Sequence, residues 1–154
     1  MSFLKASWEN LVLANYIIEP KILSAYIPNG TELDLWNGKC YVSLVGFLFK
    51  NTKLLGLKIP FHVNFEEVNL RFYVKRKENN KWKRGVVFIK ELVPKWALSF
   101  VANAIYKEHY QTVPMKNHIL ITNEILNVCY EWQINNKWYS IEVSAEQECS
   151  LIKK

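Results

Sequence analysis

The chain has 154 residues, of which half are apolar and 14% aromatic, with a formal net charge of +6. This length suits one domain spanning residues 1–154, and the apolar content is too high for a disordered chain. No apolar run reaches the ~18 residues of a transmembrane helix, and the first residues lack a secretory signal pattern. Three widely spaced cysteines do not predict a disulfide framework, so we expect a cytoplasmic protein without membrane contact.

The first quarter of the chain predicts a strand and a short helical turn. Residues 11–16 are mostly apolar and favour a strand. Pro20 suits the first position of a helix, which predicts a helical turn over residues 20–26.

A hairpin signal follows. Asn37-Gly38 is the dipeptide typical of a type I′ turn, and it predicts pairing of residues 33–36 with 39–49. Gly46 lies inside the second of these strands and indicates a bulge or a close backbone approach.

Two long strands over 63–76 and 85–92 are predicted next, joined by a hairpin loop around Asn79-Asn80. Side chains alternate between the two faces of a strand. The first strand therefore carries Leu70, Phe72 and Val74 on one face, and Glu67, Asn69, Arg71 and Tyr73 on the other.

Pro94 begins the main predicted helix, over residues 94–106, and strands over 126–134 and 138–143 follow it. The short spacing of strands and turns, with one main helix, favours a mainly β (α+β) domain. We expect its antiparallel sheet to curl into a barrel. The candidates for core packing are Trp8, Trp36 and Trp96.

Three stretches, Tyr41–Phe49, Phe65–Val74 and Gly85–Met115, resemble the YqjF-like family of bacterial proteins, which belongs to the acetoacetate decarboxylase-like superfamily. The resemblance implies a mainly β barrel around a small cavity. Acetoacetate decarboxylase uses an adjacent lysine pair, because a second cation and burial lower the pKa of the nucleophilic amine.

The resemblance puts Met115 and Lys116 at the lysine pair, or His109, Tyr110 and Gln111 if the match is shifted toward the helix. Because neither alignment restores the pair, Schiff-base decarboxylation is not expected. The family usually continues with further strands beyond the matched region. An unpaired sheet edge is a pairing hazard, so we expect a homodimer.

The sheet-lined cavity is predicted to bind a small, partly apolar carbonyl or carboxylate compound. The candidate ligand-binding residues are Glu67, Asn69, Arg71, Tyr73, Tyr110 and Met115. One alternative is an enzyme that uses acid–base chemistry, with Glu67, His109 or Lys116 as the catalytic group. Another is an interaction module without ligand, in which the polar face is a solvent-exposed charge ladder.

Other site classes are weakly supported. The three histidines lack zinc-ligand spacing, and no phosphate loop is present, so neither a metal nor a cofactor is expected. Basic residues flank Asn79-Asn80, and Trp82 lies between two of the lysines. Such a tip can track phosphates, but no nucleic-acid-binding motif accompanies it. A solvated turn is therefore favoured over nucleic-acid binding.

Overall fold

The computed structural model describes residues 4–54, 56–58, 63–94 and 110–146. Strands dominate this part of the chain, and its one helix is a short 3₁₀ helix, η1. In chain order the elements are β1 (Leu4–Ile18), η1 (Pro20–Tyr26), β2 (Glu32–Leu33), β3 (Cys40–Leu54), β4 (Phe65–Glu78), β5 (Lys81–Val93), β6 (Tyr110–Thr112), β7 (Met115–Ile121), β8 (Ile125–Ile134) and β9 (Lys137–Glu146).

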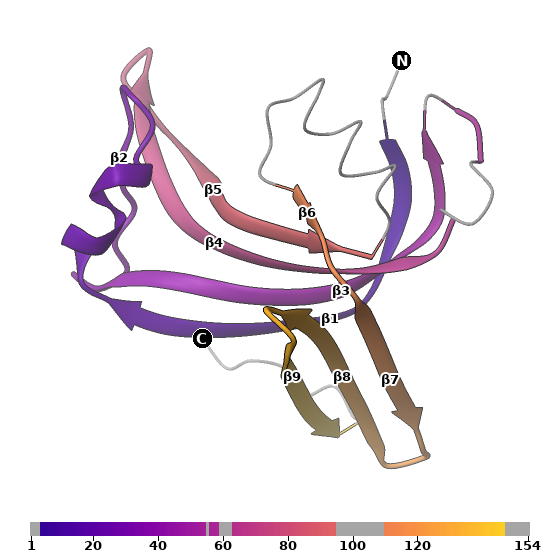
Figure 1. The fold of residues 1–154 in the computed structure, drawn as a ribbon. Helices are drawn as coiled ribbons and strands as arrows, with labels where there is room; N and C mark the ends of the chain where they lie inside the picture. Colours follow the sequence, from indigo (N-terminus) through magenta and orange to yellow (C-terminus); the bar gives the residue numbers. More distant parts are fainter. Residues whose placement is uncertain (1–3, 55, 59–62, 95–109, 147–154) are drawn as a thin grey trace.

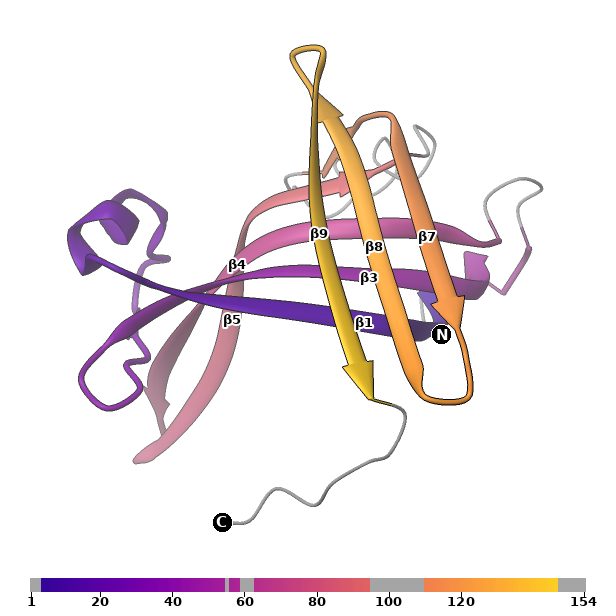
Figure 2. The same ribbon diagram turned by 90° about the horizontal axis from the view of Figure 1, so that it is seen from below.

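The strands form two sheets. A six-stranded sheet has the order β1-β3-β4-β5-β6, with β2 also paired to β4, and a three-stranded sheet has the order β7-β8-β9. The first sheet is strongly curved, and the second lies against its convex side (Figure 1). Seen from below, the strands of the second sheet cross those of the first (Figure 2).

The mainly β class and the helical turn over 20–26 are confirmed. The predicted closure into a barrel is not confirmed. Among the described strands the first sheet ends at β1 and β6, and β7 to β9 pair only with one another. The predicted helix over 94–106 lies outside the described residues apart from Pro94. One pair, β5 with β6, is parallel, which requires the long crossover that separates these strands.

The Asn37-Gly38 turn is confirmed by φ angles of 49° and 74°, the left-handed values of a type I′ turn. Only Trp36 and Lys39 pair across it, however. The preceding strand β2 pairs with β4 instead of β3. The β3–β4 ladder begins at Val42, so β2 occupies the place beside β4 that β3 leaves free.

The predicted long loop around Asn79-Asn80 is wrong, because the structure has a shorter turn there. Asn79 and Asn80, with φ angles of 49° and 60°, form a two-residue turn, and Glu78 pairs directly with Lys81. The charged residues on both sides of the turn belong to the ladder, and ion pairs such as that of Lys83 with Glu78 form across it. Exposed charges are compatible with a strand that reaches into solvent.

The convex face of the first sheet forms the main core with the second sheet. Val12, Leu48 and Val68 pack there with Tyr130 of β8. A Cβ added at Gly46 would lie 2.6 Å from Cδ2 of Tyr130. The close backbone approach predicted at this glycine is therefore confirmed, and the aromatic ring is what approaches it.

A second core lies at the other end of the convex face. Phe72 is fully buried there among Leu23 of η1, Cys40, Val42 and Val74. The core packing predicted for two tryptophans is wrong, since Trp8 and Trp36 are 61% and 63% exposed. Trp8 lies on the edge strand, where its ring contacts Phe47 at 5.0 Å but leaves its outer side open. Trp96 lies outside the described residues.

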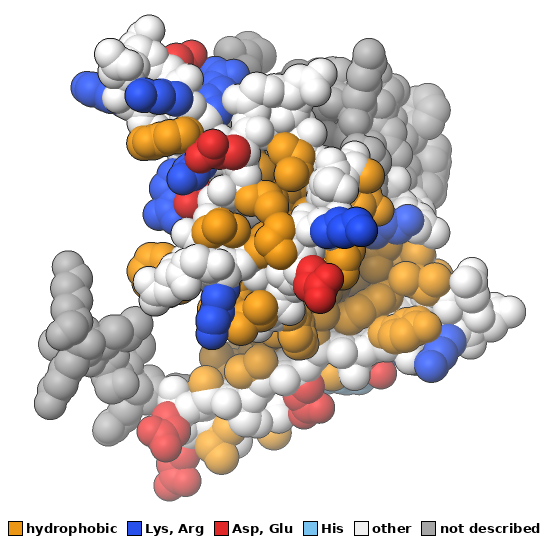
Figure 3. Space-filling model, turned by 90° about the vertical axis from the view of Figure 1, so that its left-hand side faces the viewer, with side chains coloured by type: hydrophobic (Ala, Val, Ile, Leu, Met, Phe, Trp, Pro, Cys, Tyr) orange, Lys and Arg blue, Asp and Glu red, His pale blue; other side chains and the backbone are white. Residues whose placement is uncertain are grey.

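Apolar side chains are also exposed at the end of the molecule that carries η1 and the β4–β5 hairpin. Figure 3 shows them gathered between the basic hairpin tip above and the second sheet below. The exposed apolar side chains of β1 and η1 include Tyr16, Ile17, Ile22 and Tyr26. Within the described ranges, no helix has the length and apolar character that crossing a membrane requires.

The Tyr130 hydroxyl ties the two sheets together. It donates a hydrogen bond of 2.9 Å to the backbone oxygen of Asn10, in an irregular stretch of β1. Burial raises the pKa of this phenol well above its ordinary value, and the Glu66 carboxylate adds to the rise. The pKa of Tyr130 is higher in the folded protein than in the unfolded chain. The protonated phenol therefore stabilises the fold fully below about pH 10, and this stabilisation is lost as the pH rises above that value.

We expect Tyr130→Phe to lower the free energy of unfolding by about 1 kcal/mol near neutral pH, because the Asn10 oxygen loses its partner. The variant should also lose less stability than the parent protein between about pH 10 and pH 11. Urea unfolding across this range measures both effects. Tyr26→Phe, at an exposed tyrosine, is the control and should follow the parent curve. Parallel curves for all three proteins would contradict the assignment.

Candidate functional site

The concave face of the first sheet carries the polar residues of β4. The β3–β4 register places Val45 beside Asn69 and Ser43 beside Arg71, so these side chains share one face. Glu67 and Tyr73 have the same parity along β4. Residues of the opposite parity, such as Val68, face the second sheet. The division of β4 into two faces is thus the one that the alternation predicts.

Glu67 is a buried carboxylate within a hydrogen-bonded cluster. It is 3% exposed, and Asn69, which is 2% exposed, donates from Nδ2 to Glu67 Oε1 at 2.9 Å. The Tyr110 hydroxyl, from β6, lies 3.4 Å from Glu67 Oε2 and donates to it. The structure therefore brings together Glu67, Asn69 and Tyr110. A buried cluster differs in kind from a solvent-exposed charge ladder, because burying a charge is costly unless it is hydrogen-bonded.

Glu91 is a second buried carboxylate beside this cluster, and the sequence pattern does not predict it. It is 2% exposed and lies directly opposite Asn69 on β5. Alternation along β5 from the turn onward would put Glu91 on the convex face, together with Val87. A register shift between Leu70 and Arg71 moves it to the concave face. The only signal in the sequence is a carboxylate within a mostly apolar strand end.

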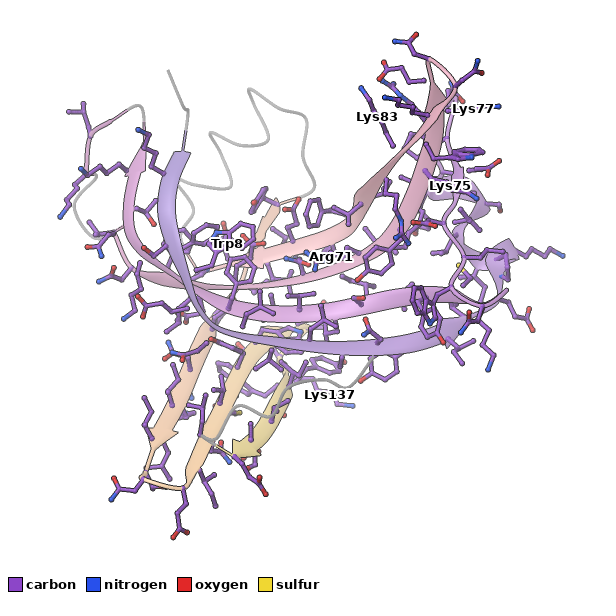
Figure 4. The ribbon with its side chains drawn as sticks, turned by 180° about the vertical axis from the view of Figure 1, so that it is seen from behind. Trp8, Arg71, Lys75, Lys77, Lys83 and Lys137 are labelled. Carbon is purple, nitrogen blue, oxygen red and sulfur yellow. The ribbon has the colours of Figure 1, made fainter. Side chains whose placement is uncertain are left out.

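Arg71 lies in the hollow of the curved sheet beside this cluster (Figure 4). Its side chain is half-buried, and its Nε atom is buried without a hydrogen-bond partner in the part of the chain that the structure describes. Within the same part, Asn69 Oδ1 is also buried and unpaired. Each such group costs about 1–3 kcal/mol. A bound molecule that accepts from Arg71 and donates to Asn69 would remove both costs.

An apolar wall adjoins the polar cluster on the concave face. Trp8 covers part of this wall, with its ring 5.0 Å from that of Phe47 and 6.1 Å from that of Phe49 (Figure 4). The buried members of the wall are Val45, Phe47, Phe49, Phe65 and Val93. Polar groups converging beside apolar walls are the usual composition of a small-molecule site.

Two other predicted site residues, Met115 and Lys116, lie away from this cluster. Met115 packs at the main core between the sheets. Lys116 is exposed on the outer face of the second sheet, with Nζ 4.4 Å from the centre of the Trp138 ring. His109 lies outside the described residues. Of the residues matched to the decarboxylase lysine pair, Met115 and Lys116 therefore lie away from Glu67, whereas Tyr110, from the shifted match, donates to it.

Metal ligation and thiol chemistry find little support among the residues with described positions. These include no group of three or more histidine, cysteine or acidic side chains placed to hold a metal ion. Burial raises the pKa of the Cys40 thiol, and burial with nearby carboxylates raises that of Cys129. Both cysteines are accordingly poor nucleophiles near neutral pH.

The basic tip of the β4–β5 hairpin partly neutralises its own charge. Lys75, Lys77 and Lys83 gather at this tip (Figure 4). Lys75 pairs with Glu32 at 3.1 Å, while Lys83 and Arg76 both pair with Glu78. The Lys83 and Arg76 cations hold the pKa of the Glu78 carboxyl below its usual value. This arrangement is that of a solvated, ion-paired strand end.

Solved structures with the same architecture define the fold as that of acetoacetate decarboxylase and its relatives. Acetoacetate decarboxylase from Legionella pneumophila aligns with a TM-score of 0.56 and 12% identity, over 86% of this chain and 52% of its own. The enduracididine biosynthesis enzyme MppR, complexed with pyruvate, aligns with a TM-score of 0.63 and 12% identity, over 93% and 56%. At this identity the likeness shows the fold alone.

The chain belongs to the DUF2071 family of uncharacterised conserved proteins, whose sequence model matches residues 5–153. A curated relative is the uncharacterised protein YqjF of Bacillus subtilis (strain 168), which is 33% identical over 86 residues. That match covers 55% of this chain and 34% of YqjF. The chain thus spans just over half of the matched structures and about a third of this relative.

Proposed function

We propose that the concave face binds a small, partly apolar carboxylate that also carries a carbonyl, enol or hydroxyl group. The observation that carries the proposal is the half-buried Arg71, whose buried Nε lacks a hydrogen-bond partner within the described chain beside the Glu67–Asn69 pair. A guanidinium matches a carboxylate in geometry as well as in charge.

The second polar group of the ligand follows from Asn69. Its Nδ2 donates to Glu67, which leaves Oδ1 as a buried acceptor. An enol or hydroxyl group of the ligand would donate to this oxygen. The phenylalanines of the wall would contact the apolar part of the ligand. Support for a small acid also comes from MppR, a protein of the same fold that has been solved with pyruvate.

Pyruvate is the first probe, titrated into ¹⁵N-labelled protein and followed by NMR. We expect saturable shifts at the amides of β4 and β5, and at least about tenfold weaker binding to Arg71→Gln, because a charge-assisted pair is lost. The control is Arg76→Gln, which removes an exposed arginine of the same strand and should leave the affinity unchanged. Equal binding by the parent protein and Arg71→Gln, or no saturable shift, would overturn the proposal.

The same samples address acid–base catalysis. The buried Glu67 carboxylate, with Tyr110 within hydrogen-bond reach, has the composition of a proton-transfer site. Exchange of the pyruvate methyl protons for deuterium, followed in D₂O and lost in Glu67→Gln, would favour an enzyme over a binding protein.

We further infer a homodimer formed through β1. This strand is 15 residues long, lies at an edge of the first sheet, and exposes Leu11, Tyr16 and Ile17. A long apolar edge strand is a template for pairing with another strand. A second copy placed there would extend the curved sheet toward closure. Native mass spectrometry reads the oligomeric state and any retained ligand together.

A further inference from the structure

A pocket of about 420 Å³ opens at the far end of the concave face. Tyr73 lies in its wall and follows Arg71 by two residues on the same face of β4, so the pocket begins where the Arg71 site ends. Strand geometry separates the two residues by about 7 Å along β4. The lining residues are Asn15, Asp34, Trp36, Tyr41, Tyr73 and Arg84.

A chain of hydrogen bonds fixes the polar groups in the floor of this pocket. The Ser43 hydroxyl, which is fully buried, donates to Asn15 Oδ1 at 2.5 Å and lies 2.6 Å from the Tyr73 hydroxyl. Ser43 has one proton, and Asn15 receives it, so Tyr73 must be the donor to Ser43. The proton positions along the chain Tyr73–Ser43–Asn15 are thereby determined.

This direction decides what the floor offers to a bound molecule. With its proton turned toward Ser43, the Tyr73 oxygen presents only lone pairs. Asn15 Oδ1 accepts from Ser43, and the two N–H groups of Asn15 have no partner among the residues that the structure describes. The floor thus presents an acceptor and a donor side by side.

The walls are aromatic and one rim is charged. Trp36, Tyr41 and Tyr73 supply flat apolar surfaces. Arg84 donates through Nε to Asp34 Oδ2, and the Asp34 amide donates to the Tyr73 carbonyl at 3.0 Å, which fixes the rim to β4. Aromatic rings prefer offset or edge contacts with other rings. A planar ring therefore fits these walls better than an aliphatic chain does.

We propose that the pocket is a subsite for an aromatic or heteroaromatic ring, and that the full ligand is an aryl-substituted 2-oxo or 2-hydroxy acid. The inference rests on the proposed function, because the acid group of the ligand would lie at Arg71. The spacing of Arg71 and Tyr73 suits a carboxylate separated from a ring by a short linker. A ring hydroxyl or ring nitrogen would contact the donor and acceptor provided by Asn15 and Tyr73.

The test compares phenylpyruvate with pyruvate by the same NMR titration. We expect phenylpyruvate to bind at least about tenfold more tightly, with additional shifts in β1 and around Trp36, since ring contacts add to the gain from buried apolar area. Trp36→Ala should reduce the ratio of the two affinities toward one. Trp82→Ala, at an exposed tryptophan of the hairpin tip, is the control and should leave the ratio unchanged.

A third probe, 4-hydroxyphenylpyruvate, tests the polar floor. We expect 4-hydroxyphenylpyruvate to bind more tightly than phenylpyruvate, because its ring hydroxyl can donate to the Tyr73 oxygen. This difference in affinity should disappear in Tyr73→Phe, which keeps the ring and removes the acceptor oxygen. Pyruvate binding that depends on Arg71, together with equal affinities for pyruvate and phenylpyruvate, would overturn the ring subsite and leave the proposed function standing. Phenylpyruvate binding that depends on Trp36 but not on Arg71 would keep the pocket and overturn the proposed carboxylate site.

Discussion

Replacing Gly46 with alanine is expected to lower the free energy of unfolding by about 2–4 kcal/mol, because the core has no room for the added methyl group. The new Cβ would lie 2.6 Å from Tyr130 Cδ2 and 3.2 Å from both Cγ and Cε2. The ring cannot turn away at low cost, since it is fully buried and its hydroxyl donates to Asn10. The sheets must separate locally or the ring must leave its rotamer.

Gly85→Ala is the matched control, because Gly85 also lies within a strand of the first sheet. The nearest atom to a Cβ at Gly85 is Val74 Cγ2 at 4.0 Å, which is ordinary contact. This variant should therefore be neutral or up to about 1 kcal/mol more stable, since alanine restricts the unfolded chain. Equilibrium urea unfolding compares the two proteins. If they unfold at the same midpoint, the tight approach of Tyr130 to Gly46 does not exist in solution.

Phe72→Ala should cost about 3–5 kcal/mol, the usual range for emptying a fully buried phenylalanine site. Phe72 has no exposed surface and packs with Leu23, Cys40, Val42 and Val74. Leu23 comes from η1, so the cavity would also weaken the contact that holds this helix on the sheet. The neighbouring backbone is part of a ladder and cannot collapse fully into the space.

The control for Phe72 is Phe88→Ala on the adjacent strand. Phe88 lies opposite Arg71 and is only half-buried, on the concave face. Since less apolar area is lost and solvent can occupy the space, its cost should be under about half of that for Phe72. Thermal unfolding with urea titration measures both variants. A larger loss for Phe88 than for Phe72 would mean that the two faces of β4 and β5 have been interchanged.

Much of the first sheet could be predicted from the sequence because its signals are local. Asn37-Gly38 determines a turn through backbone sterics, and alternation along β4 divides its side chains between two faces whatever lies across from them. The strand ends near Asn79-Asn80 differ from the prediction because runs of charged residues are typical of loops. Their cross-strand ion pairs depend on register, which local pattern does not contain.

The candidate site shows where such prediction stops. Glu67, Asn69 and Arg71 follow from parity alone, and the structure places them on one face. The position of Glu91 does not follow from parity. The register shift between Leu70 and Arg71 changes which residues of β5 lie on the concave face, and it is visible only in the strand pairing. Lys116 is a candidate only through its alignment with a lysine pair. The structure places it in a separate sheet, a division that strand patterns cannot reveal.

The hydrogen bond between Tyr130 and Asn10 joins residues 120 positions apart, and this separation bears on how the chain folds during synthesis. The strands β1 to β5 can pair through nearby turns as they leave the ribosome. The part of their convex face that packs on the second sheet, however, stays uncovered until β8 has been made, which takes several seconds at about 5–20 residues per second. Nascent chains in this interval present an apolar surface to chaperones, and folding should be slow for the size of the domain.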